Sequence, residues 1–292
     1  MMRARDVLGD AQKELIIAGE WMTPRIFAYD KAAGKFEEVQ RTGLQNLYGW
    51  WQTVSAADVN GDGKTDLILG NIGENFYLHP TQEEPVKLWM NDFDQNGTID
   101  KILSRSVGGR DVPVFLKRDL EEQLPILKKQ NLHHKDYATK SVSELFSAEV
   151  MGKSVEKDFT YAASCIAWNE GGGKFTVEKL PAMSEMSSVH AVLVEDVNGD
   201  GRKDLVMGGN KYGFPPQFGR LDGSYGDVLI NEGKRKFRWE EPIRSGILVK
   251  GEVRDIKEVT RADGSRMILY LINDDYPRAF DLNFKSQISN LK

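Results

Sequence analysis

The sequence predicts an all-β fold, a partial β-propeller or one of about four or five repeat units, with a helical insertion around residues 104–160. Two observations predict the repeat: an acidic loop phrase and a hairpin phrase, each of which occurs three times. A third observation, a stretch with helical spacing, breaks this pattern and defines the insertion. We therefore expect one propeller-like domain over residues 1–292, with residues 104–160 inserted within one blade.

The acidic phrase is nearly identical at residues 58–70 and 196–208, and a copy at residues 92–103 keeps its spacing. Oxygen side chains recur at positions one, three, five and nine, with glycine at position six for a sharp turn. Such a loop can wrap its own oxygens around a hard cation, and calcium loops also use a backbone carbonyl at position seven. We predict about three Ca²⁺ sites. Their candidate ligands are Asp58, Asn60, Asp62, Lys64 and Asp66; Asp92, Asp94, Asn96, Thr98 and Asp100; and Asp196, Asn198, Asp200, Arg202 and Asp204.

The residues that follow each loop exclude an EF-hand. An EF-hand needs a glutamate at position twelve and a helix leading out of the loop, but position twelve is Leu69, Leu103 or Met207. Each copy runs into a short apolar stretch that is typical of a buried strand. The alternative is a plain turn rich in Asp, Asn and Gly. A plain turn does not require aspartate at position nine, which favours the metal loop.

Further copies extend the pattern along the chain. Residues 6–19 hold a worn acidic phrase in which Leu8 and Ala11 replace a ligand and the turn glycine, so we expect the shape without the ion. A degenerate copy covers residues 262–269. The hairpin phrase, an apolar residue, Asx, a glycine-bearing turn and Lys-Phe or a close variant, occurs at residues 29–36, 168–175 and 230–237. Loop, strand, strand, hairpin and strand therefore form one repeating unit.

The insertion has helical signals of its own. Residues 118–129 have helical spacing that Pro125 interrupts, and Ser141 with Glu144 forms a plausible capping box. We expect this stretch to leave the blade and return to it.

Composition limits the partners. The formal charge of −5 argues against nucleic acid or an anionic membrane, and no apolar run is long enough for membrane insertion. Three bound calcium ions would add six positive charges and take the formal charge from −5 to +1. Without metal, the carboxylates gathered in the tight loops would repel one another, so we expect chelation to destabilise the fold. Weak calcium loops suit a compartment with millimolar calcium. We expect an extracellular, cell-surface or periplasmic location, and the absence of a signal-like start is consistent with a fragment of a longer protein.

One long loop is a candidate binding surface. Residues 210–227 are punctuated by glycine and proline and are rich in aromatic side chains, and long loops in repeat folds often bind ligands. The alternative is that these aromatics only pack over the edge of a blade. The candidate ligand-binding residues are Tyr212, Phe214, Arg220, Asp222 and Tyr225.

The acidic phrase together with Asn-x-Gly-x-x-x-Phe resembles the FG-GAP/VCBS repeat of integrin-α-type β-propellers. Phrases at residues 49–51, 70–75, 208–210 and 245–254 resemble bacterial VCBS/FG-GAP proteins of the kind that also bear an ASPIC/UnbV domain. The resemblance implies a calcium-stabilised propeller that binds proteins or glycans at the cell surface or envelope. This chain has fewer repeat units than integrin-like propellers. We therefore expect a partner, or the rest of a longer propeller chain, to complete the propeller.

Two functions from different classes follow. The first is a binding or adhesion module for a glycan or protein, in which calcium holds loops in place. The alternative is a polysaccharide lyase or hydrolase on a propeller scaffold. The carboxylates that we can place are already committed as metal ligands, and no catalytic constellation is evident in the sequence, so we assign no catalytic residue and favour binding.

Overall fold

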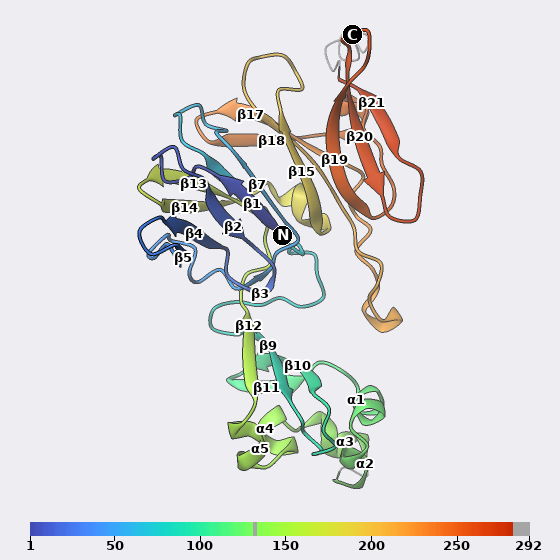
Figure 1. The fold of residues 1–292 in the computed structure, drawn as a ribbon. Helices are drawn as coiled ribbons and strands as arrows, with labels where there is room; N and C mark the ends of the chain where they lie inside the picture. Colours follow the sequence, from blue (N-terminus) through green and yellow to red (C-terminus); the bar gives the residue numbers. More distant parts are fainter. Residues whose placement is uncertain (131–132, 283–292) are drawn as a thin grey trace. The chain divides into compact units, whose positions relative to one another are not determined.

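The computed structural model describes residues 1–130 and 133–282, and these residues are mostly β (Figure 1). The chain divides into two compact units. The first comprises Met1–Tyr77 together with the chain from Ala162 onward, and the second comprises Leu78–Tyr161. The sequence had suggested a single domain with an insertion that starts at residue 104. The second unit starts earlier because it includes the acidic loop at residues 92–100 and the strand before it.

Four antiparallel sheets follow one another along the first unit, as expected for propeller blades, and we number them blades 1 to 4. Blades 1 to 3 have four strands, and blade 4 has three among the described residues.

Blade 1 contains β1 (Met2–Arg5), β2 (Glu14–Ile17), β4 (Arg25–Asp30) and β5 (Lys35–Glu38). Blade 2 contains β7 (Thr53–Ala57), β8 (Asp66–Gly70), β13 (Cys165–Gly171) and β14 (Lys174–Lys179). Blade 3 contains β15 (Val189–Glu195), β16 (Asp204–Gly209), β17 (Asp227–Gly233) and β18 (Lys236–Glu240). Blade 4 contains β19 (Val253–Thr260), β20 (Arg266–Ile272) and β21 (Arg278–Asp281).

Short elements connect the blades. Strands β3 (Glu20–Met22) and β6 (Gly49–Trp50) pair with each other outside the four blades. The remaining connections contain η1 (Ala182–Met186), η2 (Pro216–Phe218) and α6 (Pro242–Ser245).

The acidic loops join strand to strand, as the sequence predicted. The loop at 58–66 connects β7 to β8, and the loop at 196–204 connects β15 to β16. The worn copy at 6–14 connects β1 to β2 in the same way. The hairpin phrases connect the third strand of each of these blades to the fourth. No helix leads out of any of these loops within the described residues, which confirms that they are not EF-hands.

The hydrophobic core lies between successive blades. Ile68, Ile166 and Trp168 of blade 2 cluster with Leu205, Met207 and Leu229 of blade 3. On the other face of blade 3, Val206 and Val228 cluster with Ile268 and Tyr270 of blade 4. A central blade therefore buries both of its faces, which explains why its inner strands read as unbroken apolar runs rather than alternating ones.

The second unit combines a sheet with short helices. Its strands are β9 (Val86–Asn91), β10 (Asp100–Val107), β11 (Arg110–Pro113) and β12 (Val155–Phe159), in the order β11-β10-β9-β12. Its helices are α1 (Lys117–Gln123), α2 (Ile126–Gln130), α3 (His134–Ala138), α4 (Val142–Leu145) and α5 (Ala148–Gly152). Phe93 and Ile102 cluster with apolar side chains of the helices, including Leu120, Tyr137 and Leu145.

The prediction of helix across residues 104–160 was only partly correct. Helices lie within residues 117–152, whereas both ends of the predicted range are strands. Residues 104–107 continue β10, which follows the acidic loop at 92–100, and residues 110–113 form β11, which pairs back onto them. The interruption at Pro125 separates α1 from α2, and Glu144 Oε2 accepts a bond from Ser141 N at 2.7 Å at the start of α4. Over the described residues, every helix is too short to span a bilayer.

Candidate functional site

The acidic loop at residues 92–100 brings three carboxylates together. Asp92, Asp94 and Asp100 each place one oxygen within 4.8 Å of the others. Backbone bonds set this arrangement: Asn96 N and Gly97 N each donate to Asp92 at 2.9 Å, and Phe93 N donates to Asp100 Oδ2 at 3.2 Å. Gly97 has a φ of +88°, a conformation that glycine adopts readily, which explains its place at position six.

This loop fits a divalent cation. Asp94 Oδ1 is buried and has no hydrogen-bond partner, and a buried oxygen without a partner is costly. Three carboxylates held this close repel one another, and calcium prefers hard oxygen ligands. Asp92, Asp94 and Asp100 would hold the ion, whose positive charge would compensate their negative charges. The loop is anchored through Phe93, which is 3% exposed in the core of the second unit.

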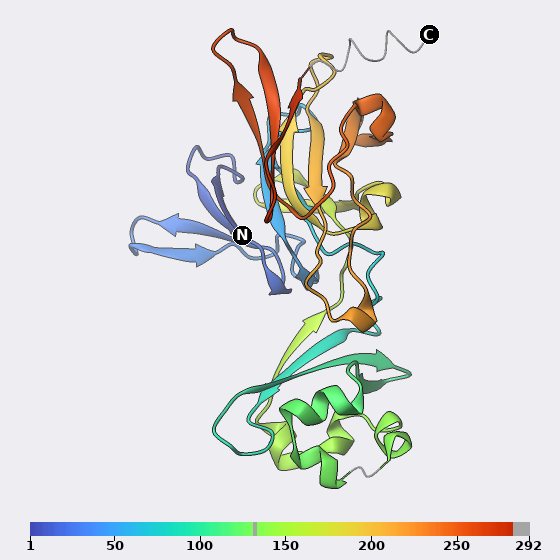
Figure 2. The ribbon, with the colours of Figure 1, turned by 90° about the vertical axis from the view of Figure 1, so that its right-hand side faces the viewer.

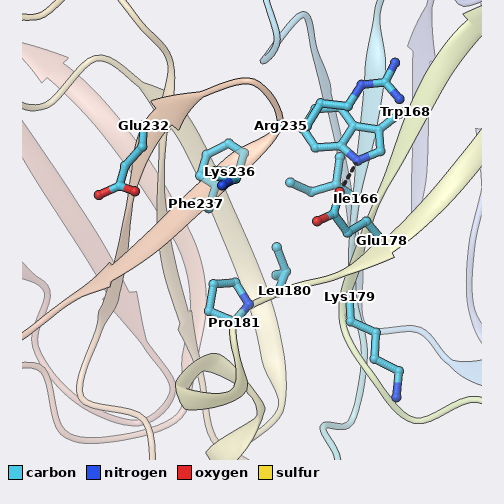
Figure 3. Close-up of a pocket in the computed structure, with 10 residues that line it drawn as sticks. All are labelled: Ile166, Trp168, Glu178, Lys179, Leu180, Pro181, Glu232, Arg235, Lys236 and Phe237. Carbon is cyan, nitrogen blue, oxygen red and sulfur yellow. Dashed lines mark hydrogen bonds between the residues drawn. The ribbon is translucent and has the colours of Figure 1, made fainter.

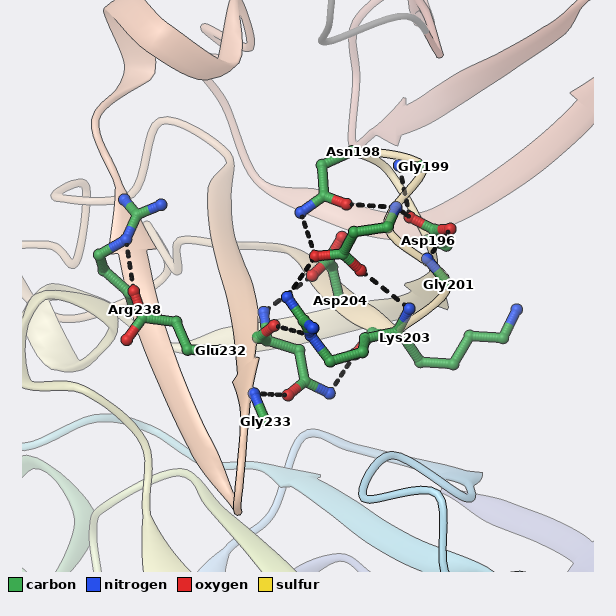
Figure 4. Close-up of polar contacts among 12 residues, drawn as sticks. Asp196, Asn198, Gly199, Gly201, Lys203, Asp204, Glu232, Gly233 and Arg238 are labelled. Carbon is green, nitrogen blue, oxygen red and sulfur yellow. Dashed lines mark hydrogen bonds and ion pairs between the residues drawn. The ribbon is translucent and has the colours of Figure 1, made fainter.

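The other two intact loops differ in how their carboxylates are bonded. In the loop at 196–204, Asp196 accepts bonds from Gly199 N at 2.6 Å and Gly201 N at 2.9 Å (Figure 4). Asp200 Oδ2 accepts from Asn198 Nδ2 at 3.0 Å and pairs with Arg202 Nη2 at 2.5 Å.

The loop at 58–66 repeats this arrangement, since Asp62 Oδ2 lies 3.5 Å from Lys64 Nζ. Within residues 1–130 and 133–282, the close group of three carboxylates is found in the loop at 92–100. Calcium in the other two loops stays a prediction.

Aspartate at position nine anchors the loop. Asp204 is fully buried; its Oδ2 accepts from Val197 N at 3.0 Å and its Oδ1 from Asn231 N at 2.8 Å. Asp66 accepts bonds from the equivalent two residues of blade 2, Val59 N at 3.1 Å and Asn169 N at 2.8 Å. Burial raises the pKa of both carboxyls, and the N–H donors offset part of that rise. These aspartates tie each loop to the third strand of its own blade.

The asparagine of the hairpin phrase joins neighbouring blades, a role that the sequence did not reveal. Asn231 Nδ2 donates to Val59 O of blade 2 at 2.7 Å and to Lys203 O of its own blade at 2.9 Å. Asn169 Nδ2 donates in the same way to Val7 O of blade 1 at 2.8 Å. We call these two residues the interblade latch. The recurrence of this asparagine with an acidic loop was the available signal, but a hairpin turn explained it equally well.

The structure corrects the alignment of the first hairpin. The sequence pattern aligned Asp30 with Asn169 as equivalent positions of the hairpin phrase. In the structure, Phe36 pairs with Tyr29 in blade 1, whereas Phe175 pairs with Asn169 in blade 2. Blade 2 has a β-bulge here, which uses Gly171 at a φ of +95°. Blade 1 has Lys31 at the corresponding point, two residues after Tyr29, and its register shows no bulge. The latch position of blade 1 is therefore Tyr29.

The long loop at residues 210–227 forms a small pocket. Four of the five predicted ligand-binding residues, Tyr212, Arg220, Asp222 and Tyr225, line a cavity of about 150 Å³ with Lys250. The Arg220 guanidinium lies 4.7 Å from the centre of the Tyr212 ring, and its Nε is 2.9 Å from Asp222 Oδ2. Lys250 Nζ lies 5.9 Å from the centre of the Tyr225 ring. Two aromatic rings and two cations thus meet in one concavity.

Phe214 lies elsewhere. Its ring centre is 5.2 Å from that of Phe76 and 6.1 Å from that of Tyr77. This residue fits the alternative in which the aromatics of the loop pack over a blade edge.

The floor of the pocket is fixed by Asn210, which is 1% exposed. Its Oδ1 accepts from Ser187 Oγ at 2.8 Å and Ser224 N at 3.0 Å, and its Nδ2 donates to Ser224 O and Gly251 O, both at 2.9 Å. All hydrogen-bonding groups of this amide are therefore used within the protein, so the pocket is preorganised.

A larger cavity of about 350 Å³ lies between blades 2 and 3 (Figure 3). Trp168 and Phe237 stack across it with ring centres 6.4 Å apart, and Trp168 Nε1 donates to Glu178 Oε2 at 3.0 Å. Arg235 lies 5.2 Å from the centre of the Trp168 ring. Sequence reasoning missed this cavity because its walls come from chain segments that only the packing of the blades brings together.

Successive four-stranded sheets joined by acidic strand-to-strand loops define a repeat protein of blade-like units. Residues 6–69 match the model of the FG-GAP-like repeat, a span that covers most of blade 1 and reaches β8 of blade 2. The chain thus contains the repeat that its motifs resembled. No curated protein matches the chain.

Proposed function

We propose that this chain is a calcium-binding β-propeller module that captures a glycan or protein ligand in the pocket of residues 210–227. The observation behind this proposal is the convergence of Tyr212, Arg220, Asp222 and Tyr225 on one cavity. Flat aromatic faces beside fixed charges suit sugar rings or polar peptide segments.

Calcium has a structural role in this proposal. The three carboxylates at residues 92–100 and the unpartnered Asp94 Oδ1 support an ion in this loop, and we assign to it the role of holding the loop in place. The matching spacing at residues 58–66 and 196–204 extends the proposal to these loops.

The charge of the pocket refines the ligand class. Arg220 and Lys250 contribute two positive charges, and of the lining residues Asp222 is the carboxylate, already paired with Arg220. An acidic sugar or an acidic protein segment would complement this balance, whereas the overall charge of −5 disfavours nucleic acid.

We place this activity outside the cell, at the cell surface or in the periplasm, where free calcium is high enough for weak loops. The resemblance to adhesion propellers supports this location, and we propose the rest of a longer propeller chain as a further partner.

A glycan array with acidic and neutral sugars tests the proposal. Tyr212→Ala with Tyr225→Ala should reduce binding at least tenfold while the melting temperature stays close to that of the wild type. Tyr276→Ala is a matched control, since this tyrosine is 83% exposed and lies outside the pocket. Unchanged glycan binding by the double variant would reject this pocket as the binding site. Cleavage of an acidic polysaccharide by the wild type would instead support the alternative of a polysaccharide lyase or hydrolase.

A further inference from the structure

Blade 1 presents a sheet face built like the interfaces between blades. The loops and registers align Leu15, Ile17 and Phe36 of blade 1 with Leu205, Met207 and Phe237 of blade 3. In blade 3, Leu205, Met207 and Phe237 pack against blade 2. The blade 1 positions therefore belong to the face that, in a repeat array, contacts the preceding blade.

In blade 1 this face is uncovered within the first unit. Phe36 is 52% exposed and Tyr29 is 46% exposed, whereas Phe175, at the position of Phe36 in blade 2, is 5% exposed. Leu15, Ile17 and Phe27 are half-buried, although the matching Leu205, Met207 and Leu229 are fully buried. Ile16 and Ile26 point to the opposite face and are fully buried. The blue strands of blade 1 stand apart from the red strands of blade 4 (Figure 2).

The composition of this face favours a contact with another chain. The latch asparagine is replaced by Tyr29, whose ring centre lies 5.2 Å from that of Phe36. Aromatic side chains are enriched at protein interfaces, and exposed apolar patches on a sheet mark interaction sites.

Blade 4 offers a complementary face. Ile268, Tyr270 and Ile272 point toward blade 3, and the alternate residues Met267, Leu269 and Leu271 lie on the opposite face. These three are half-buried, unlike the fully buried alternate residues of the central blades. Blade 4 thus has an apolar face at the position where a following blade would pack.

We propose that the open face of blade 1 binds the open face of blade 4 of a second copy of this chain, head to tail. The interface would continue the face-to-face packing of successive blades that runs from blade 1 through blade 4. Two copies in this arrangement contribute eight sheets, within the range of known propellers, and form a closed ring when the rotation between the copies continues the rotation between successive blades.

Sedimentation velocity on the full chain with calcium tests this proposal. The wild type should form a dimer with rising concentration. Phe36→Asp and Leu269→Asp should each weaken dimerisation at least tenfold, because a charge would be buried at one end of the contact. Ile243→Asp, at a 76% exposed position of α6, is the control and should leave the dimer intact. Circular dichroism and a melting curve establish that each variant is folded.

Disulfide trapping tests the same contact without charged substitutions, so its result does not depend on how those substitutions affect the stability of the fold. In a chain with Phe36→Cys and Leu269→Cys, oxidation should yield covalent dimers, whereas either change alone should not produce this cross-link. A wild type that stays monomeric at all concentrations, or a cross-link within a single chain, would reject the proposal. Equal amounts of Phe36→Asp and Leu269→Asp should associate more strongly than either variant alone, because the mixture retains one intact contact.

Discussion

The acidic loops at residues 196–204 and 92–100 share a motif and a position between two antiparallel strands, but their carboxylates have different partners. In the loop at 196–204, Arg202 pairs with Asp200, and each oxygen of Asp204 accepts a bond from a backbone N–H group. In the loop at 92–100, Thr98 replaces the arginine and Asp94 Oδ1 has no partner. One spacing of acidic residues therefore supports two uses, an anchor of the loop to its own blade and a cluster suited to a cation.

The largest expected effect concerns Asp204, which anchors the loop at 196–204 to its own blade. Asp204→Ala should lower the free energy of unfolding by about 4 kcal/mol, because it leaves two buried N–H groups without acceptors. Asp204→Asn, which keeps an acceptor, should lose about half as much. Urea unfolding in the absence of calcium measures both. A loss below about 1 kcal/mol for the alanine variant would show that Asp204 does not anchor the loop.

Glu185 is a buried acid outside the acidic loops, so it shows the effect of burial on a carboxyl pKa without the loop motif. Burial raises the pKa of Glu185 to about 8, although both of its oxygens accept from Ser164 N. The folded state therefore holds a proton that the unfolded state releases above pH 4.5, and stability decreases as pH rises from there to about 8.

The unfolding free energy of the wild type relative to Glu185→Gln should fall by about 3 kcal/mol between pH 5 and 7.5. A flat difference between the two proteins over this range would contradict the raised pKa. Urea unfolding at each pH, at fixed ionic strength, gives the comparison.

Calcium should act through the loop at 92–100. Free calcium at a hundred times its dissociation constant should stabilise the folded state by about 2.7 kcal/mol, and EDTA should reverse this. Hydrogen exchange should slow in β9 and β10. Asp94→Asn should abolish the slowing, whereas Asp200→Asn, the matched control in the other loop, should not affect it. Equal protection of β9 and β10 from hydrogen exchange with EDTA and with calcium would show that this loop does not bind the metal.

The smallest expected effect concerns the latch. Asn231→Ala should cost about 2 kcal/mol, because its amide loses two bonds to carbonyl oxygens, one of them in blade 2. Glu232→Ala is the control. It breaks an exposed ion pair with Arg238, so its cost should be about 0.5 kcal/mol. Unfolding free energies that do not separate the two variants would mean that Asn231 serves only its own hairpin.

Local patterns were read correctly where contacts close in sequence decide the structure. The acidic phrases run from strand to strand, the hairpin phrases form hairpins, and Pro125 divides two helices. The extent of the inserted unit was missed, because Ser104 and Arg105 pair with the strand that starts at Val86, and residues 110–113 pair in turn with residues 104–107. The register of the first hairpin was also missed, since it depends on a bulge that has no signal in residue spacing alone.

Residue spacing was enough to recognise the repeated units, their turns and the cluster of Asp92, Asp94 and Asp100, because each depends on groups within about ten residues of one another. Packing of the sheets decided the rest: which loop gathers its carboxylates, that Asn231 reaches Val59, and that the side chains of residues 212–225 enclose a pocket with Lys250. These contacts join segments far apart in the chain. Their geometry follows from how one buried sheet stacks on the next, and no local periodicity encodes that stacking.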